Sequence, residues 1–113
     1  MSFVERRGFE RIEYTQGDRE RPVFALDDHA FPVADCAERG LRYLPEPLAE
    51  LPSPGSEIRG VVRFPGGREA FIEGVVVRAE RSGVGVHFTE HWIDKEVIES
   101  ERRRLRGPES YAG

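Results

Sequence analysis

A period-two alternation of hydrophobic residues with polar or small residues constrains the fold more than any other feature of the chain. It runs through residues 58–64, 70–76 and 84–88. Successive side chains of a β-strand point to opposite faces of a sheet, so this spacing predicts half-buried strands. The turn-forming sequences Pro65-Gly66-Gly67 and Arg81-Ser82-Gly83 separate the three runs. We therefore expect three successive strands joined by short connections.

Three further strands are expected earlier in the chain. Hydrophobic and polar residues alternate over 12–14, residues 23–26 form a second run, and a short strand is expected at 41–43. The stretch 45–56 contains four prolines and one glycine, which is typical of a loop. Six short strands without intervening helices fit a closed barrel, because closure leaves no strand edge exposed. The predicted fold is mainly all-β, a six-stranded antiparallel β-barrel.

The end of the chain has the pattern of an α-helix over about 93–106. Acidic residues come first and arginines last, an order that suits the helix dipole. Thr89 and Asp94 are both candidate N-caps, and Gly107-Pro108 is the expected stop. We expect this C-terminal helix to pack on the barrel through a thin hydrophobic stripe.

The length of 113 residues, 38% of them hydrophobic, fits one compact domain. We expect a single domain over 1–113, with a flexible arm at 1–10, a barrel at about 11–89 and the helix after it. The only cysteine, Cys36, excludes an intrachain disulfide and any zinc site that needs a CxxC pair. There is no apolar run of roughly 20 residues and no apolar secretion signal. These features predict a cytoplasmic protein without membrane insertion.

The charge of the chain narrows the class of ligand. Its 21 acidic and 17 basic residues give a net charge of −4, which disfavours binding to a nucleic acid polymer. All the basic residues except Lys95 are arginines. Codon usage is one explanation of this bias. The other is function, because arginine forks onto phosphate or a guanine edge and stacks on flat rings, which favours a small anionic ligand.

Three arginines, Arg6, Arg7 and Arg11, lie close together near the start of the chain. Arg7 and Arg11 form an Arg-x-x-x-Arg pair, and the same spacing occurs in 59–63 and 102–106. So many arginines give about two such pairs by chance, so the spacing alone is not specific. The later pairs are explained by the solvent face of a strand and by the basic end of a helix. We expect Arg11 to point outward, with Arg6 and Arg7 on an arm that can close on a ligand.

A second motif, Asp35-Cys36-Ala37-Glu38-Arg39-Gly40, is expected to form a turn before the strand at 41–43. Together with Arg7-Gly8-Phe9-Glu10-Arg11, it resembles the PilZ domain, a bacterial receptor for cyclic di-GMP. That family has an Arg-x-x-x-Arg motif at its first strand and an Asp/Asn-x-Ser-x-x-Gly motif after the second. The match departs from the second motif at Ala37. Residues 74–78 and 83–88 also look like the final hairpin of the family.

The resemblance implies a six-stranded barrel that binds cyclic di-GMP and signals to a protein partner, with no catalytic residue, metal or cofactor. The residues implied to bind the ligand are Arg6, Arg7, Arg11, Asp35, Ala37 and Gly40. Arg6, directly before the first motif, is similar to the arrangement in members that bind a stacked pair of ligand molecules. We expect the arm to change conformation when the ligand binds.

The chemistry of the two motifs suits a ligand with two phosphates and two guanines. Arginine can donate to phosphate oxygens and to O6 and N7 of guanine, and Asp35 can accept from the N1–H and N2–H₂ edge. Gly40 allows a close approach or a positive φ, although a plain turn explains both Gly40 and Asp35 as well. Ala37 lacks the hydroxyl that family members present to the ligand. One lost hydrogen bond weakens binding about tenfold at most.

Other functions remain as alternatives. The main one is a ligand-independent adaptor that binds a protein through the same barrel, and Ala37 is its chief support. An RNA-binding barrel would need a basic face with exposed aromatic residues. His87 and His91 have the spacing of metal ligands on a helix but lack an obvious third ligand. No motif marks Cys36 as an activated nucleophile, and we expect no enzymatic activity.

Overall fold

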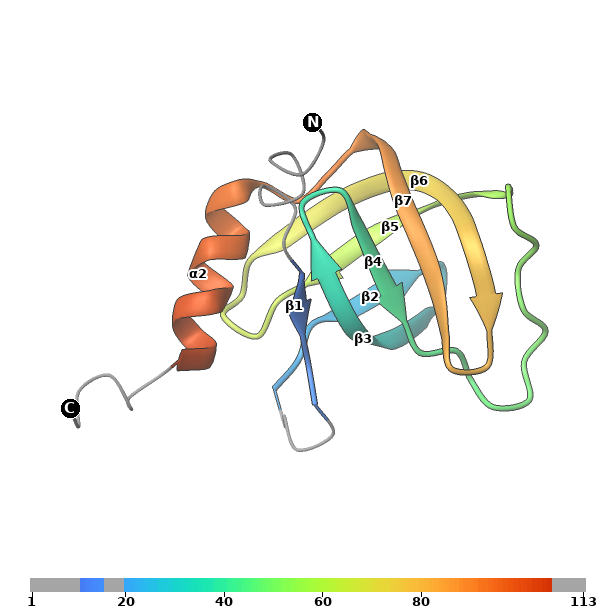
Figure 1. Cartoon of the computed structure of the whole chain (residues 1–113), viewed down its shortest axis with the longest axis horizontal. Helices are drawn as coiled ribbons and strands as arrows, with labels where there is room; N and C mark the ends of the chain where they lie inside the picture. Colours follow the sequence, from blue (N-terminus) through green and yellow to red (C-terminus); the bar gives the residue numbers. More distant parts are fainter. Residues whose placement is uncertain (1–10, 16–19, 107–113) are drawn as a thin grey trace, which may run out of the picture.

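A computed structural model describes residues 11–15 and 20–106 of the chain. The predicted arm at 1–10 and the predicted helix stop at 107–108 lie outside these residues. The described part is a mainly antiparallel β-structure followed by one helix (Figure 1). Its strands are β1 (Ile12–Glu13), β2 (Val23–Leu26), β3 (His29–Ala37), β4 (Gly40–Tyr43), β5 (Glu57–Arg63), β6 (Glu69–Glu80) and β7 (Gly83–His91).

Six of these strands close into a barrel. The pairing runs in the order β3-β2-β5-β6-β7-β4, and β4 pairs back with β3. All the pairs are antiparallel. β1 is a short addition that pairs with β3. The prediction of a six-stranded antiparallel barrel is confirmed.

The inward side chains of the strands form one hydrophobic core. The largest side chains that are fully buried include Phe24, Phe88, Leu41 and Ile72, which come from four different strands. Removing such a side chain from water stabilises the fold by roughly 1.5–3 kcal/mol. The alternation over 58–64 does place Ile58, Val62 and Phe64 in this core.

The prediction of a turn at 35–40 is wrong. Most of this motif belongs to β3, a strand that we did not expect from the sequence. Only Glu38 and Arg39 form the turn to β4. Val33 pairs with Tyr43, but Asp35 pairs with Arg42, so β3 contains one extra residue at a β-bulge. Bulges of this kind redirect side chains and are common next to functional sites. Here the bulge turns Asp35 outward while Cys36 enters the core.

The helix α2 (Lys95–Arg106) packs beside β1 at one side of the barrel, opposite the long loop between β4 and β5 (Figure 1). Asp94 caps its N-terminus, because the Asp94 side chain and carbonyl accept hydrogen bonds from the first turn. Thr89, the other candidate cap, lies in β7 and the prediction for it is wrong. Val97 and Ile98 bury the narrow apolar face of the helix.

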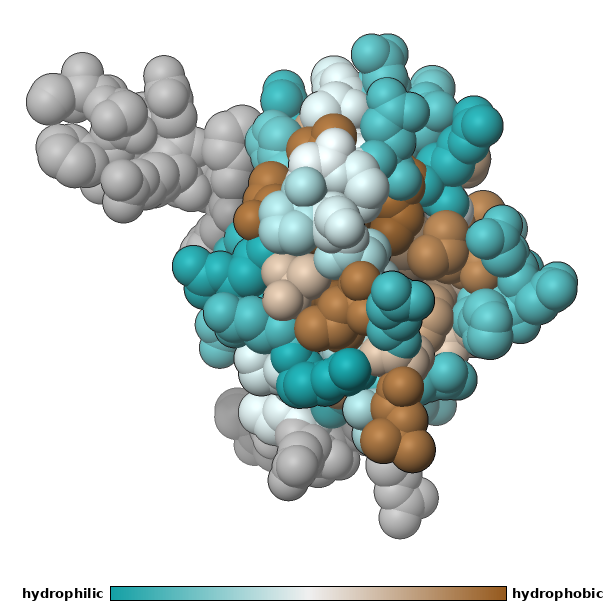
Figure 2. Space-filling view, turned by 90° about the vertical axis from the view of Figure 1, so that its right-hand side faces the viewer, coloured by the Kyte–Doolittle hydropathy of each residue, from teal (hydrophilic) through white to brown (hydrophobic). Residues whose placement is uncertain are grey.

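On the face that carries the β4–β5 loop, the described residues form no extended hydrophobic patch. Hydrophobic residues form separate patches among hydrophilic ones there (Figure 2). Within the described residues, α2 is too short and too polar to cross a bilayer, and no other helix meets that requirement.

Candidate functional site

A groove of about 880 Å³ crosses the outer face of β3, β4, β7 and β6. This volume lies within the range of small-molecule sites in proteins. Three of its lining residues, Ala37, Gly40 and Gly85, have a methyl group or no side chain. Gly40 pairs with Ala37, so these two small residues lie side by side on β4 and β3, while Gly85 lies on β7 opposite Arg42. They leave room for a flat ligand above the sheet.

The carboxylate of Asp35 is the most buried charged group in the groove. It is 5% exposed, and each of its oxygens accepts a hydrogen bond from a different arginine. Arg11 Nη1 lies 2.5 Å from Oδ1, and Arg42 Nε lies 2.8 Å from Oδ2. The two arginine side chains are 54% and 44% exposed. Each carboxylate oxygen has two lone pairs, so Asp35 retains capacity to accept from a ligand.

The groove is cationic although the protein is acidic. It is lined by four arginines and two acidic residues, whereas the whole chain has a net charge of −4. The charged residues of the lining are Arg11, Arg39, Arg42, Arg78, Glu13 and Asp35. A local surplus of arginine in a concave site attracts anions and donates forked hydrogen bonds to them.

The structure brings together four of the six residues that the sequence singled out. Arg11, Asp35, Ala37 and Gly40 all line the groove. Arg11 is exposed, as expected from the inward positions of Ile12 and Tyr14. The remaining two, Arg6 and Arg7, lie outside the described residues.

The structure requires a glycine at position 40 for a reason other than the one expected. Positive φ angles are found at other glycines but not at Gly40. A Cβ atom at this position would lie 2.8 Å from the carbonyl oxygen of Val86. Gly40 therefore allows β4 and β7 to approach closely under the groove.

Several groove residues were not predicted as site residues. Arg42, Arg78 and His87 enter the groove from β4, β6 and β7. Arg39 enters from the β3–β4 turn, and its guanidinium lies 4.2 Å from the ring centroid of Trp92. The two-residue turn could have placed Arg42 opposite Asp35, but only if β3 had been recognised as a strand.

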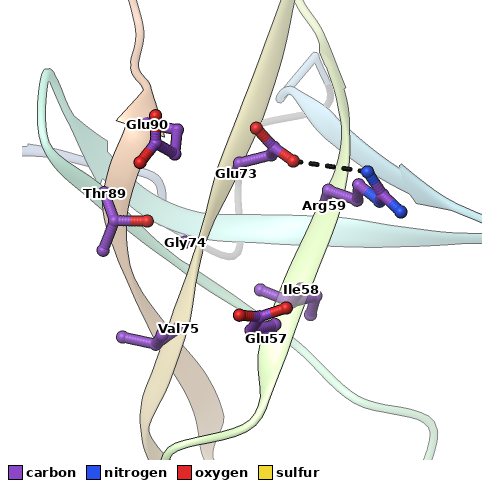
Figure 3. Close-up of a pocket in the computed structure, with 8 residues that line it drawn as sticks. All are labelled: Glu57, Ile58, Arg59, Glu73, Gly74, Val75, Thr89 and Glu90. Carbon is purple, nitrogen blue, oxygen red and sulfur yellow. Dashed lines mark hydrogen bonds and ion pairs between the residues drawn. The ribbon is translucent and has the colours of Figure 1, made fainter.

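A second hollow, of about 310 Å³, lies on β5, β6 and β7 and has the opposite charge (Figure 3). It contains Glu57, Glu73 and Glu90, and Arg59 donates to Glu73 at 3.4 Å. Among residues 11–15 and 20–106, no group of three His, Cys, Asp or Glu side chains is arranged to hold a metal ion. The acidic lining makes this hollow less suited to an anion than the groove with its four arginines.

A buried polar cluster connects β1 to α2 behind the groove. The Tyr14 hydroxyl donates to Glu101 Oε2 at 2.8 Å, and Arg104 donates to both oxygens of the same carboxylate. This hydrogen bonding raises the pKa of Arg104. Burial raises the pKa of Tyr14 above its ordinary value, and burial raises the pKa of Cys36 to about 12. The Cys36 thiol is therefore protonated at neutral pH.

The two histidines with ligand-like spacing do not converge. His87 lines the groove, whereas His91 Nε2 lies 3.5 Å from Oε1 of Glu73, a residue of the acidic hollow. His91 also packs its ring 5.2 Å from that of Phe71.

Comparison of the chain with protein-family models, with curated proteins and with solved structures found no match. The likeness to the PilZ domain therefore rests on the sequence motifs.

Proposed function

We propose that this protein is a receptor for cyclic di-GMP rather than an enzyme, and that it binds the nucleotide in the groove around Asp35. One observation carries the proposal: Arg11 and Asp35 lie 24 residues apart in the chain, yet their side chains meet at 2.5 Å in a cationic groove. They belong to the two motifs that resemble those of the PilZ domain.

The groove supplies the groups that a dianionic guanine nucleotide needs. Arg11 can donate to phosphate oxygens or to O6 and N7 of guanine, and the Asp35 carboxylate can accept from N1–H and N2–H₂. The side chain of Val77, 58% exposed, adds an apolar contact for a base on the wall of the groove. We propose that Arg6 and Arg7 complete the site from the arm, and that a second stacked nucleotide binds there.

Strand β1 offers a route from the groove to a protein partner. Arg11 directly precedes the strand and contacts Asp35, whereas Tyr14 directly follows it and binds Glu101 of α2. A ligand that draws Arg11 away from Asp35 would therefore act on both the arm and α2. Binding becomes a signal if the two arrangements present different surfaces to the partner.

Isothermal titration calorimetry with cyclic di-GMP tests the proposal. We expect the wild type to bind and the Kd of Arg11→Ala to rise by about 30-fold or more, because a charged hydrogen bond contributes roughly 1.5–3 kcal/mol and the site also loses a positive charge.

Arg59→Ala is the matched control. Arg59 is also a member of an Arg-x-x-x-Arg pair, and its side chain is 74% exposed and pairs with Glu73 in the acidic hollow. The two variants change the net charge equally, so a general electrostatic effect would weaken both. Unchanged affinity in Arg11→Ala would refute the site, and absence of binding in the wild type would refute the receptor.

Ala37 favours one other function, a ligand-independent adaptor. Ala37 pairs with Gly40 and lines the groove, where it offers no hydroxyl to a nucleotide. An adaptor function predicts a stable complex with a protein partner and no heat of binding with cyclic di-GMP.

A further inference from the structure

Arg42 has the position of a ligand-binding residue, although neither sequence motif includes it. It lies on β4 directly opposite Asp35, on the outer face of the barrel. Its side chain lines the groove and is 44% exposed. A ligand that reaches Asp35 must therefore pass close to Arg42.

Two hydrogen bonds orient the Arg42 guanidinium before any ligand arrives. Nε donates to Oδ2 of Asp35 at 2.8 Å, and Nη1 donates to the carbonyl oxygen of Ser82 at 3.1 Å. Nη2 makes no hydrogen bond to any residue that the structure describes. Its two N–H groups are free to donate, and the cost of ordering the side chain has already been met on folding.

Gly83, the first residue of β7, makes room for this side chain. A Cβ atom at position 83 would lie 2.7 Å from both Cγ and Cδ of Arg42. Such a contact is far inside van der Waals distance, so the arginine would have to move. The position of Arg42 is thus built from three strands: its own, that of Asp35 and that of Gly83.

The charges around Asp35 favour an anion at this point of the groove. Two guanidinium groups contact one carboxylate, which leaves a surplus of one positive charge. Charged donors bind anionic oxygen more strongly than neutral oxygen. A phosphate oxygen therefore suits Arg42 better than a guanine edge.

We propose that Arg42 is a fourth ligand-binding arginine, and that its Nη2 donates to a phosphate oxygen of cyclic di-GMP in place of the hydrogen bond that Ala37 cannot make. This assignment rests on the proposed function, since it concerns the same ligand. With Arg42 as a donor, the groove keeps its capacity to donate a hydrogen bond to the ligand although Ala37 lacks the hydroxyl of the second motif.

Calorimetry on four proteins tests the assignment. We expect the Kd for cyclic di-GMP to rise by about 10- to 100-fold in Arg42→Ala. Gly83→Ala should weaken binding at least about threefold without any change of charge, because it displaces Arg42. The control is Gly66→Ala, where an added Cβ meets nothing within 4 Å, and it should bind like the wild type.

Two further measurements separate direct contact from support of Asp35. The side-chain ¹⁵N signals of Arg42, identified by their loss in Arg42→Ala, should shift when cyclic di-GMP is added. Adding Ala37→Ser to Arg42→Ala should recover up to about tenfold in affinity, since the new hydroxyl replaces a lost donor.

The outcomes distinguish this inference from the receptor proposal. If the wild type binds and Arg11→Ala does not, but Arg42→Ala binds within about twofold of the wild type, the receptor stands and the role of Arg42 is refuted. Unshifted Arg42 signals, or no recovery with Ala37→Ser, also count against it. If Arg42→Ala does not fold, Gly83→Ala decides, and binding by Gly83→Ala within about twofold of the wild type refutes the role of Arg42.

Discussion

Two carboxylates are buried to the same degree in this protein but lie in regions of opposite character. Asp35 is 5% exposed and Glu101 is 4% exposed. The partners of Asp35, Arg11 and Arg42, reach it from a groove and are about half exposed. Glu101 is enclosed by the Tyr14 hydroxyl and by Arg104, whose side chain is only 27% exposed.

The difference teaches that the partners of a buried charge, rather than its burial, distinguish a binding site from a structural anchor. Half-exposed arginines can exchange the carboxylate for a ligand, because water and ligand reach them from the same side. The pair at Glu101 is less accessible, since the Arg104 side chain is 27% exposed and the hollow beside it holds only about 40 Å³. It connects α2 to β1, and breaking a buried pair of this kind is costly.

The largest expected effect is on binding in Asp35→Ala. The affinity for cyclic di-GMP should fall by at least about 100-fold, because the guanine donors lose their charged acceptor. The free energy of unfolding should change by only about 1 kcal/mol, since the two arginines can turn to water. Calorimetry and urea unfolding measure the two quantities, and a large loss of stability without loss of binding would reverse our comparison.

The converse effect is expected in Glu101→Ala. Its free energy of unfolding should fall by about 2–3 kcal/mol, because the Tyr14 hydroxyl loses its acceptor and Arg104 its partner. Affinity for cyclic di-GMP should stay within about threefold of the wild type at a temperature where the variant is folded. Glu99→Ala, an exposed change on the same helix, is the control and should cost less than about 0.5 kcal/mol.

The smallest effect is alkaline destabilisation from the buried region. The pKa of Cys36 is raised by burial from 9.0 to about 12, and burial also raises the pKa of Tyr14 and Tyr43 above 10.0. The unfolded chain therefore loses these protons first, so stability is complete below about pH 9 and declines as the pH rises towards 12. The free energy of unfolding should fall by up to about 1.4 kcal/mol per pH unit for each group that is ionised in the unfolded chain and protonated in the folded one.

Urea unfolding at pH 8 and at pH 10.5 measures this decline. Cys36→Ala should flatten it most between pH 9 and about 10, because Cys36 has the lowest pKa of these three buried groups in the unfolded chain. A wild type that is equally stable at both pH values would contradict the role of these buried groups.

Most of the barrel could be predicted from the sequence, because β5 to β7 alternate regularly and have turn residues between them. β3 could not, for two physical reasons. Pro32 interrupts it, and the bulge at residues 33–35 breaks the alternation on which a strand prediction depends. Residues 33–37 are also buried on both faces, so no polar residue marks a solvent side apart from Asp35 itself.

The candidate site was predictable only in part for the same reason. Arg11 and Asp35 could be selected from motifs that lie in sequence order, whereas Arg42 and Gly83 depend on strand pairing. Arg42 contacts a carboxylate seven residues earlier and a carbonyl group 40 residues later. Such a position is defined by the register of three strands, which local sequence does not specify.

The single extra residue in β3 decides which face of the strand carries Asp35. Side chains of a strand alternate between its two faces, so a ladder that continued from the Val33–Tyr43 pair without a bulge would place Asp35 opposite Leu41. The carboxylate would then face the hydrophobic interior and the thiol of Cys36 would face the solvent. Deleting Ala34, in contrast, would remove the bulge and leave Asp35 opposite Arg42 on the groove side.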